Sequence, residues 1–235
     1  WLEDTDTYLE YAIKDTQLIS DLDNKMNITN SILSLQRLLV APFDACFYAS
    51  NMGTIYFSKT AYWKAPTGRK TGRKDYDGAM VYNPLTEGTN GLHWGVAAFD
   101  FAGLYPSMMV ARNISWETKS MKPTSFAVNL STPKDFSECK HTDMLYYNTD
   151  ELGMLPKSVL NLKTLRDLYK QKRKESSSTE EYNKWDSNQL AVKRLMASFY
   201  GVLAYQGFGW ADVDLAASIT ASAREAIRTA AFKVR

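Results

Sequence analysis

The sequence has little cysteine and little histidine, which argues against a disulfide-stabilised domain and against a zinc-stabilised domain. Only two cysteines, Cys46 and Cys139, occur in 235 residues, and they are too few and too far apart to predict a disulfide framework. Together with His93 and His141 they show no zinc-ligand spacing. The scarcity of cysteine indicates a reducing compartment.

The sequence also lacks a long hydrophobic run, a secretory signal, an internal repeat and an excess of charge of one sign. Lys and Arg number 28 against 26 Asp and Glu, so any electrostatic footprint must be local. We therefore expect no membrane span, and 235 residues suffice for one or two domains. Helical pattern is already under way at the first residues and continues at the last ones, so we expect the chain to be part of a larger architecture.

Basic residues concentrate in two stretches. Residues 59–74 hold six basic residues and no acidic one, which is typical of a solvated loop or of one that contacts phosphates. Residues 157–174 hold seven basic residues and one acidic residue, Asp167. Four of the seven share one helical face: Lys163, Arg166, Lys170 and Lys174. So few acidic residues on a helix favour an anionic partner.

Periodicity and capping signals predict four long helices. The first covers about residues 7–25. The second starts after Gly153, and the third starts at Ser178 with capping-box spacing and ends at Gly201. These two helices form an antiparallel pair that projects about 30 Å. A last helix, capped by Asp214, runs through residue 232.

The apolar run 94–99 predicts a strand buried on both faces, with Asp100 at its end. A carboxylate there is costly to desolvate unless a cation or several donors meet it. Gly103 accepts backbone angles closed to other residues, and Pro106 suits a helix start. The pattern predicts a metal-binding Asp beside a phosphate seat; the simpler alternative is a helix cap or turn residue.

Residues 100–107 read Asp-Phe-Ala-Gly-Leu-Tyr-Pro-Ser, which resembles the first polymerase motif of family B DNA polymerases, Asp-x-x-Ser-Leu-Tyr-Pro-Ser. Gly103 replaces the usual Ser. The resemblance implies that Asp100, with the carbonyl of Phe101, binds one of two catalytic Mg²⁺ ions. It also implies that the N–H groups of Gly103, Leu104 and Tyr105 bind the triphosphate of a dNTP. Tyr105 would exclude a ribose 2′-OH.

Residues 193–201 read Lys-Arg-Leu-Met-Ala-Ser-Phe-Tyr-Gly, which resembles the second polymerase motif, Lys-x-x-x-Asn-Ser-x-Tyr-Gly. By this resemblance Lys193 binds the triphosphate and is catalytic, because it protonates the leaving pyrophosphate. Tyr200 and Gly201 line the nascent base pair, where Gly201 contacts DNA. Ala197 stands where the family has Asn, so one dNTP-binding polar group is replaced.

Weaker matches to other motifs of the family occur in the same order along this chain as in the family. Arg166 and Lys170 match the Arg-x-x-x-Lys of the first fingers helix, which contacts the incoming dNTP. Residues 76–79, Tyr-Asp-Gly-Ala, resemble an element that contacts template DNA through Tyr76 and Gly78. Residues 113–118 and 220–224 resemble Asn-Ile-Ser-x-x-Thr and the Thr-Ala-x-x-Arg of a palm helix.

Near the start of the chain, Tyr11 and Asp15 match the Tyr-x-x-x-Asp of a proofreading exonuclease motif. They are expected to be a remnant of that domain. The resemblance thus implies an α+β fold: a polymerase palm, an antiparallel sheet with helices, that carries a two-helix antiparallel fingers hairpin. The expected domains are the end of the 3′-5′ exonuclease domain (1–30), a connecting region with a template-contacting loop (31–90), palm (91–153), fingers (154–206) and palm again (207–235).

The expected function is DNA-directed DNA polymerisation by a two-metal mechanism, with primer–template DNA and dNTPs as partners. The third motif, Tyr-Gly-Asp-Thr-Asp-Ser, is absent, and residues 147–150 are interpreted as a loop. We therefore expect a second chain or a downstream segment to supply it. The alternatives are a non-catalytic nucleic-acid- or nucleotide-binding subunit, one chain of a split polymerase, or a second metal ligand from Asp212 or Asp214. The protein is expected inside the cell, in a prokaryotic or virus-infected cytoplasm or in a nucleus.

Overall fold

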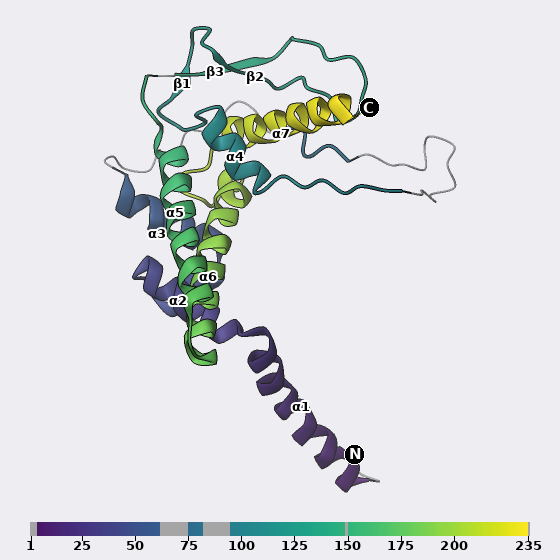
Figure 1. The fold of residues 1–235 in the computed structure, drawn as a ribbon, viewed down its shortest axis with the longest axis vertical. Helices are drawn as coiled ribbons and strands as arrows, with labels where there is room; N and C mark the ends of the chain where they lie inside the picture. The colour runs from purple at the N-terminus through teal and green to yellow at the C-terminus, as the bar shows by residue number, and fades with distance from the viewer. Residues whose placement is uncertain (1–3, 62–74, 82–94, 149, 235) are drawn as a thin grey trace.

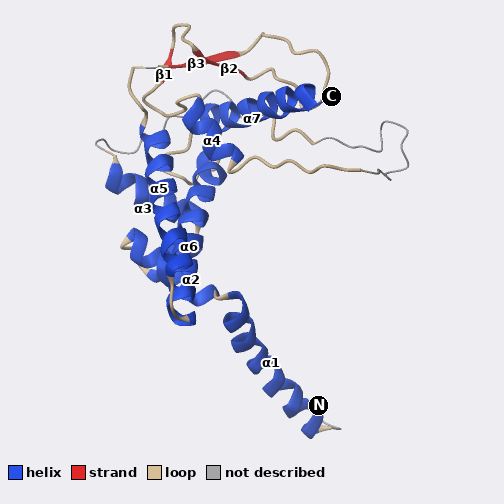
Figure 2. Cartoon of the chain, in the orientation of Figure 1, coloured by secondary structure: helices blue, strands red, loops and turns tan. Residues whose placement is uncertain are grey.

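The computed structural model describes residues 4–61, 75–81, 95–148 and 150–234, and most of them are helical (Figure 2). The cationic stretch 59–74 therefore falls almost entirely outside the described residues. The described helices are α1 (Thr5–Met26), α2 (Ile28–Leu39), a 3₁₀ helix (Phe43–Phe47), α3 (Ala49–Thr60), α4 (Leu104–Ala111), α5 (Met154–Glu175), α6 (Thr179–Leu203) and α7 (Val213–Val234).

Helices α5 and α6 form an antiparallel pair that stands beside α2 and α3 (Figure 1). As predicted, Gly153 precedes the pair, and the Ser178 hydroxyl caps α6 by accepting the N–H of Glu181. The prediction that Gly201 ends α6 is wrong, because the helix continues to Leu203. Val202 and Leu203 are buried, and their packing outweighs the about 1 kcal/mol that a helical glycine costs.

Helix α1 extends away from the rest of the chain (Figure 1). None of its residues is buried, and its N-terminal Asp4 accepts the N–H of Thr7 as a cap. Asn27, with φ 53°, separates α1 from α2. Among the described residues, no helix combines the length and apolar character that a membrane span needs.

An aromatic core joins the base of the helix pair to α3 and to the loop after α4. Phe57 of α3 is fully buried, and its ring centroid lies 4.7 Å from that of Phe199 on α6. Trp116 and Trp210 pack on the same ring, at 5.2 and 6.1 Å, and the Trp116 indole N–H donates to the carbonyl of Trp210. This core fixes where α6 ends.

A three-stranded antiparallel sheet covers α7 (Figure 1). It consists of β1 (Lys119–Ser120), β2 (Phe126–Asn129) and β3 (Met144–Tyr147) in the order β1-β3-β2. β2 contacts α7, and the buried Tyr147 of β3 donates its hydroxyl hydrogen to Ser218 Oγ at 2.7 Å. Tyr147, assigned to a loop from the sequence, is thus the last residue of a strand.

The prediction of a buried strand at 94–99 is wrong. Residues 95–101 form neither helix nor strand, and the side chains of Val96 and Phe99 are 73% and 80% exposed. A strand needs a neighbour to pair its N–H and C=O groups. None of the three described strands pairs with this segment, and Trp94 lies outside the described residues.

Candidate functional site

Three tyrosines from three distant motifs meet where α4 begins and α6 ends. Tyr105 of α4 packs on Tyr200 of α6, with ring centroids 4.3 Å apart. The hydroxyl of Tyr200 lies 3.4 Å from that of Tyr76. We call Tyr76, Tyr105 and Tyr200 the tyrosine cluster. The structure therefore brings together residues that the sequence assigned to nucleotide and DNA binding.

Within the tyrosine cluster, the hydroxyl of Tyr200 holds its proton more tightly than an ordinary tyrosine. Burial raises the pKa of Tyr200 well above its usual value, and the neighbouring hydroxyl of Tyr76 raises it further. The ring of Tyr200 is only half-buried, so part of its aromatic face is open to a ligand. Such a surface suits a base or a sugar.

A helix follows Gly103 as the sequence predicted, but it begins at Leu104, so Pro106 is its third residue rather than its first. Gly103, the residue before the helix, has φ +71°, a left-handed angle that favours glycine. Its carbonyl accepts the N–H of Ser107, while the N–H groups of the first turn have no partner within the helix. The exposed Gly103 thus leads into N–H groups that an anion can bind.

Asp100 lies three residues before Gly103 and is exposed, and Phe101 beside it is 41% exposed. In the part of the chain that the structure describes, no group of three or more His, Cys, Asp or Glu side chains could hold a metal ion. Mg²⁺ is usually held by one or two carboxylates together with substrate phosphates and water. The Asp100 carboxylate and the Phe101 carbonyl supply oxygen atoms, the ligand type that Mg²⁺ takes.

One face of α6 is open to a ligand. Lys193, Ala197 and Gly201 are all exposed, and their spacing of four residues puts them in one row. Among the described residues, a Cβ built on Gly201 would meet no heavy atom within 4 Å apart from its chain neighbours and the backbone of its own helix. The row therefore ends in free space beside Tyr200.

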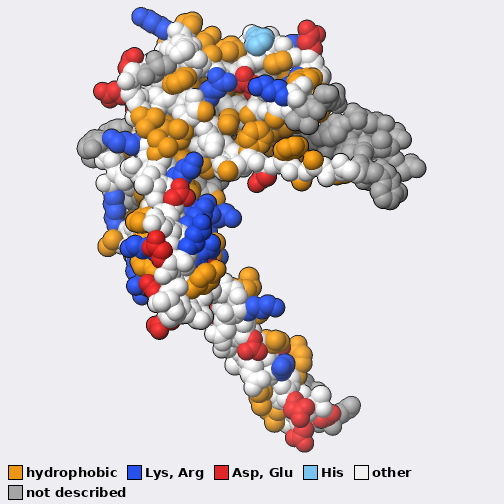
Figure 3. All heavy atoms as spheres, in the orientation of Figure 1, with side chains coloured by type: hydrophobic (Ala, Val, Ile, Leu, Met, Phe, Trp, Pro, Cys, Tyr) orange, Lys and Arg blue, Asp and Glu red, His pale blue; other side chains and the backbone are white. Residues whose placement is uncertain are grey.

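Two cations of α5 that the sequence assigned to the dNTP have side-chain partners within the helix pair. Arg166 donates from Nε to Gln189 of α6 at 3.2 Å, and Lys170 lies 3.7 Å from Asp167. Figure 3 shows Lys and Arg side chains gathered over α5 and α6, beside the hollow between this helix pair and the part that holds α4 and α7. Sequence reasoning missed Gln189, which lies one turn before Lys193 and ties Arg166 to α6.

The segment 113–118 positions the base of α5, a role that sequence matching did not assign. Asn113 donates from its amide to the carbonyls of Asn148 and Glu151, and its Oδ1 accepts the N–H of Gly153. The hydroxyl of Ser115 accepts the N–H of the second residue of α5 at 3.1 Å. These bonds fix the start of the helix pair.

The predicted cap of α7 is wrong by two residues. Oδ1 of Asp212, not of Asp214, accepts the N–H groups at the start of α7, at 3.0 and 3.4 Å. Lys119 of β1 contacts both carboxylates at about 3.0 Å. Cap and ion pairs give Asp212 and Asp214 a structural explanation, which leaves no reason to treat them as ligands of a second metal ion.

Two further predicted residues lie apart from the tyrosine cluster. Tyr11 and Asp15 are exposed on α1, which points away from α4 and α7 (Figure 1).

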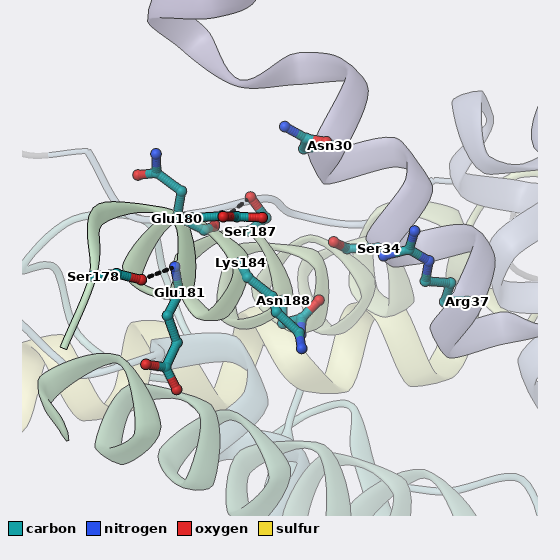
Figure 4. Close-up of a pocket in the computed structure, with 10 residues that line it drawn as sticks. Asn30, Ser34, Arg37, Ser178, Glu180, Glu181, Lys184, Ser187 and Asn188 are labelled. Carbon is teal, nitrogen blue, oxygen red and sulfur yellow. Dashed lines mark hydrogen bonds between the residues drawn. The ribbon is translucent and has the colours of Figure 1, made fainter. Parts of the chain in front are cut away.

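A polar hollow of about 670 Å³ lies between α2 and the first half of α6 (Figure 4), and it contains none of the predicted site residues. Its lining mixes cations such as Arg37 and Lys184 with carboxylates such as Glu180.

Comparisons with known proteins identify the relatives of this chain. A model of DNA polymerase family B matches residues 47–234. The "DNA polymerase 1" of Pyrococcus abyssi is 30% identical over 155 residues, which are 66% of this chain and 18% of that protein. The "DNA polymerase delta catalytic subunit" of Mesocricetus auratus is 27% identical over 162 residues, covering 69% of this chain and 14% of that subunit.

A solved structure shares the fold. The family B DNA polymerase of the hyperthermophilic archaeon Pyrobaculum calidifontis superposes with a TM-score of 0.70 at 22% identity, over 97% of this chain and 29% of that one. The chain thus spans less than a fifth of the curated relatives it matches. The mostly helical chain with a small antiparallel sheet has a polymerase fold.

Proposed function

The chain belongs to DNA polymerase family B, and on that premise we propose that it forms part of the catalytic core of a DNA-directed DNA polymerase. Such a core transfers a nucleotide from a dNTP to a primer 3′-OH under the direction of a template. The observation that supports this best is the tyrosine cluster, in which three motifs meet although 124 residues separate Tyr76 from Tyr200.

Within this proposal each part of the chain has a role. Residues 91–153 and 207–235 are palm, and residues 154–206, with the pair α5 and α6, are fingers. Residues 1–30 are the end of an exonuclease domain, of which Tyr11 and Asp15 are a remnant. Residues 31–90 connect this domain to the palm. A polymerase acts where DNA is, so we place the protein inside the cell.

The dNTP lies between the start of α4 and the open row of α6. The N–H groups of Gly103, Leu104 and Tyr105 bind its triphosphate, because they lie in the first turn of a helix. Lys193, with Arg166 and Lys170 from α5, neutralises the phosphates, and Lys193 gives a proton to the leaving pyrophosphate. Catalysis in this scheme is mainly positioning and charge stabilisation.

Asp100 and the carbonyl of Phe101 would hold Mg²⁺. When bound, the two ions of a complete site lower the pKa of the primer hydroxyl and stabilise the leaving group. The chain's own residues orient the substrate: Tyr105 excludes a ribose 2′-OH, and Ala197 leaves room beside the base. Tyr200, Gly201, Tyr76 and Gly78 line the path of the nascent pair and the template.

The second catalytic carboxylate must come from a segment that carries the third motif, which these 235 residues lack. Primer extension tests the proposal directly. The chain alone with Mg²⁺ should bind a primer–template without extending it, and adding a segment with the third motif and thumb should give extension. Extension by the chain alone would contradict the proposal that another segment supplies the second catalytic carboxylate. Binding without extension in both mixtures would favour a non-catalytic binding subunit.

A further inference from the structure

Arg224 of α7 is a buried cation whose hydrogen bonds, within the described part of the chain, go to backbone carbonyls. Its side chain is almost fully enclosed, with 1% of the residue exposed, and burial lowers the pKa of its guanidinium. Nη1 donates to the carbonyls of Asp77 and Gly78, at 2.6 and 2.7 Å. Nε and Nη2 donate to Thr132 and Leu130, at 2.7 and 3.2 Å. One side chain thus joins α7, the loop after β2 and the segment 75–81.

Thr220 lies one turn earlier on α7 and contacts the same backbone. Its hydroxyl is 2.8 Å from the carbonyl of Asp77, nearer than the carbonyls of Ala217 and Ala216 in its own helix at 3.0 and 3.3 Å. Its single hydrogen can therefore be donated to Asp77, which also accepts from Arg224. We call Thr220 and Arg224, with the carbonyls of Asp77 and Gly78, the carbonyl clamp. Residues 75–81 form neither helix nor strand, so these side-chain bonds take the place of secondary structure.

The carbonyl clamp lies directly beside Tyr76. The backbone that it grips begins one residue after this tyrosine, whose hydroxyl meets Tyr200. The segment is therefore fixed at two points, by the clamp on its backbone and by the tyrosine cluster at its side chain. Loss of either point would let the segment move relative to α6.

We propose that Thr220 and Arg224 are positioning residues for DNA binding, which hold segment 76–78 in the conformation that contacts the template without contacting DNA themselves. This inference rests on the proposed function, in which Tyr76 and Gly78 contact DNA. Thr220 acts through the carbonyl of Asp77, and Arg224 through Asp77 and Gly78. The chemical partner is a primer–template duplex.

The test is the affinity of the chain for a fluorescently labelled primer–template, measured by anisotropy. Thr220→Val keeps the shape of the side chain but removes the donor, and one hydrogen bond corresponds to about three- to tenfold weaker binding. Thr220→Ser keeps the hydroxyl and should bind as the unmodified chain does. A double variant with Tyr76→Phe should bind no more weakly than the weaker single variant, because both changes release the same segment.

Each outcome bears on a different claim. If the unmodified chain binds DNA and Thr220→Val binds equally well, or if the losses in the double variant add, the carbonyl clamp is not a positioning device and the proposed function stands. If the unmodified chain does not bind primer–template, the proposed function fails first. Should Thr220→Val not fold, Arg224→Lys carries the same test, since lysine cannot reproduce the fork of donors and should show the same non-additivity with Tyr76→Phe.

Discussion

The ring of Tyr105 lies against that of Tyr200, with centroids 4.3 Å apart and planes inclined by 36°. Tyr105 is the second residue of α4, and Tyr200 lies on the last turn of α6. The contact therefore couples the start of the proposed phosphate seat to the base of the helix pair. It also limits the directions in which the Tyr105 ring can turn away from an incoming sugar.

Removing the Tyr105 ring should relax the choice of sugar. Tyr105→Ala is expected to lower the preference for dNTPs over NTPs by about 10- to 200-fold, the range for a pocket that gains or loses room for one small group. Tyr105→Phe keeps the ring and should keep the preference. The measurement is the ratio of kcat/KM for the two nucleotides with the complemented chain. An alanine variant as selective as the unmodified chain would rule out a steric role.

Gly153 and Gly201 should respond to alanine in opposite ways. A Cβ on Gly153 would lie 2.5 Å from Cβ of Ser115 and 2.9 Å from Cγ2 of Thr118, so Gly153→Ala should destabilise by about 1–3 kcal/mol. Gly201 has open space around it within α6, so Gly201→Ala should stabilise by about 0.5–1 kcal/mol while it weakens DNA binding. Denaturant unfolding gives both values, and equal effects on stability would contradict this packing.

Lys119 should contribute more to stability than Lys134. The side chain of Lys119 is 28% exposed between the mostly buried carboxylates of Asp212 and Asp214. Lys119→Ala leaves both without this partner, at a cost of about 2 kcal/mol. The pair of Lys134 and Asp77 is more than half exposed, so Lys134→Ala should cost less than about 1 kcal/mol. Similar melting temperatures for the two variants would show that burial does not strengthen the first pair.

The chain should lose stability at alkaline pH. Burial raises the pKa of Tyr147 well above its ordinary value of 10.0, so the folded state keeps a proton that the unfolded state releases. The stability from this group is complete below pH 10 and falls as the pH rises, by up to about 1.4 kcal/mol per pH unit. Tyr147→Phe should make the decline in melting temperature above about pH 10 shallower. An unchanged slope would exclude Tyr147 as its source.

Local signals in the sequence predicted much of the fold. The capping serine at 178, the break at Gly153 and the left-handed Gly103 all act within a few residues, so the sequence alone carries them. The errors arose where distant packing decides. Helix α6 continues beyond Gly201 because Val202 and Leu203 are buried. Helix α7 is capped by Asp212 in place of Asp214.

The site was predictable as a set of residues but not as an arrangement. Motif matches indicated Tyr76, Tyr105 and Tyr200 separately, whereas their contact depends on how α4 meets α6. Arg224 was matched only as part of a pattern, because its hydrogen-bond partners are backbone carbonyls and carry no sequence signal. The proposed domain limits and the metal-binding role of Asp100 stay predictions.

The role of Asp100 is tested most directly by single-nucleotide incorporation in the complemented chain, with Asp100→Asn compared with Asp150→Asn. Both aspartates are exposed, and Asp150 lies outside the two polymerase motifs that this sequence matches. We expect Asp100→Asn to lose at least about a hundredfold in kcat, the scale of losing one charge-stabilising group, and Asp150→Asn to lose little. Full activity of Asp100→Asn, with primer–template binding intact, would contradict the account.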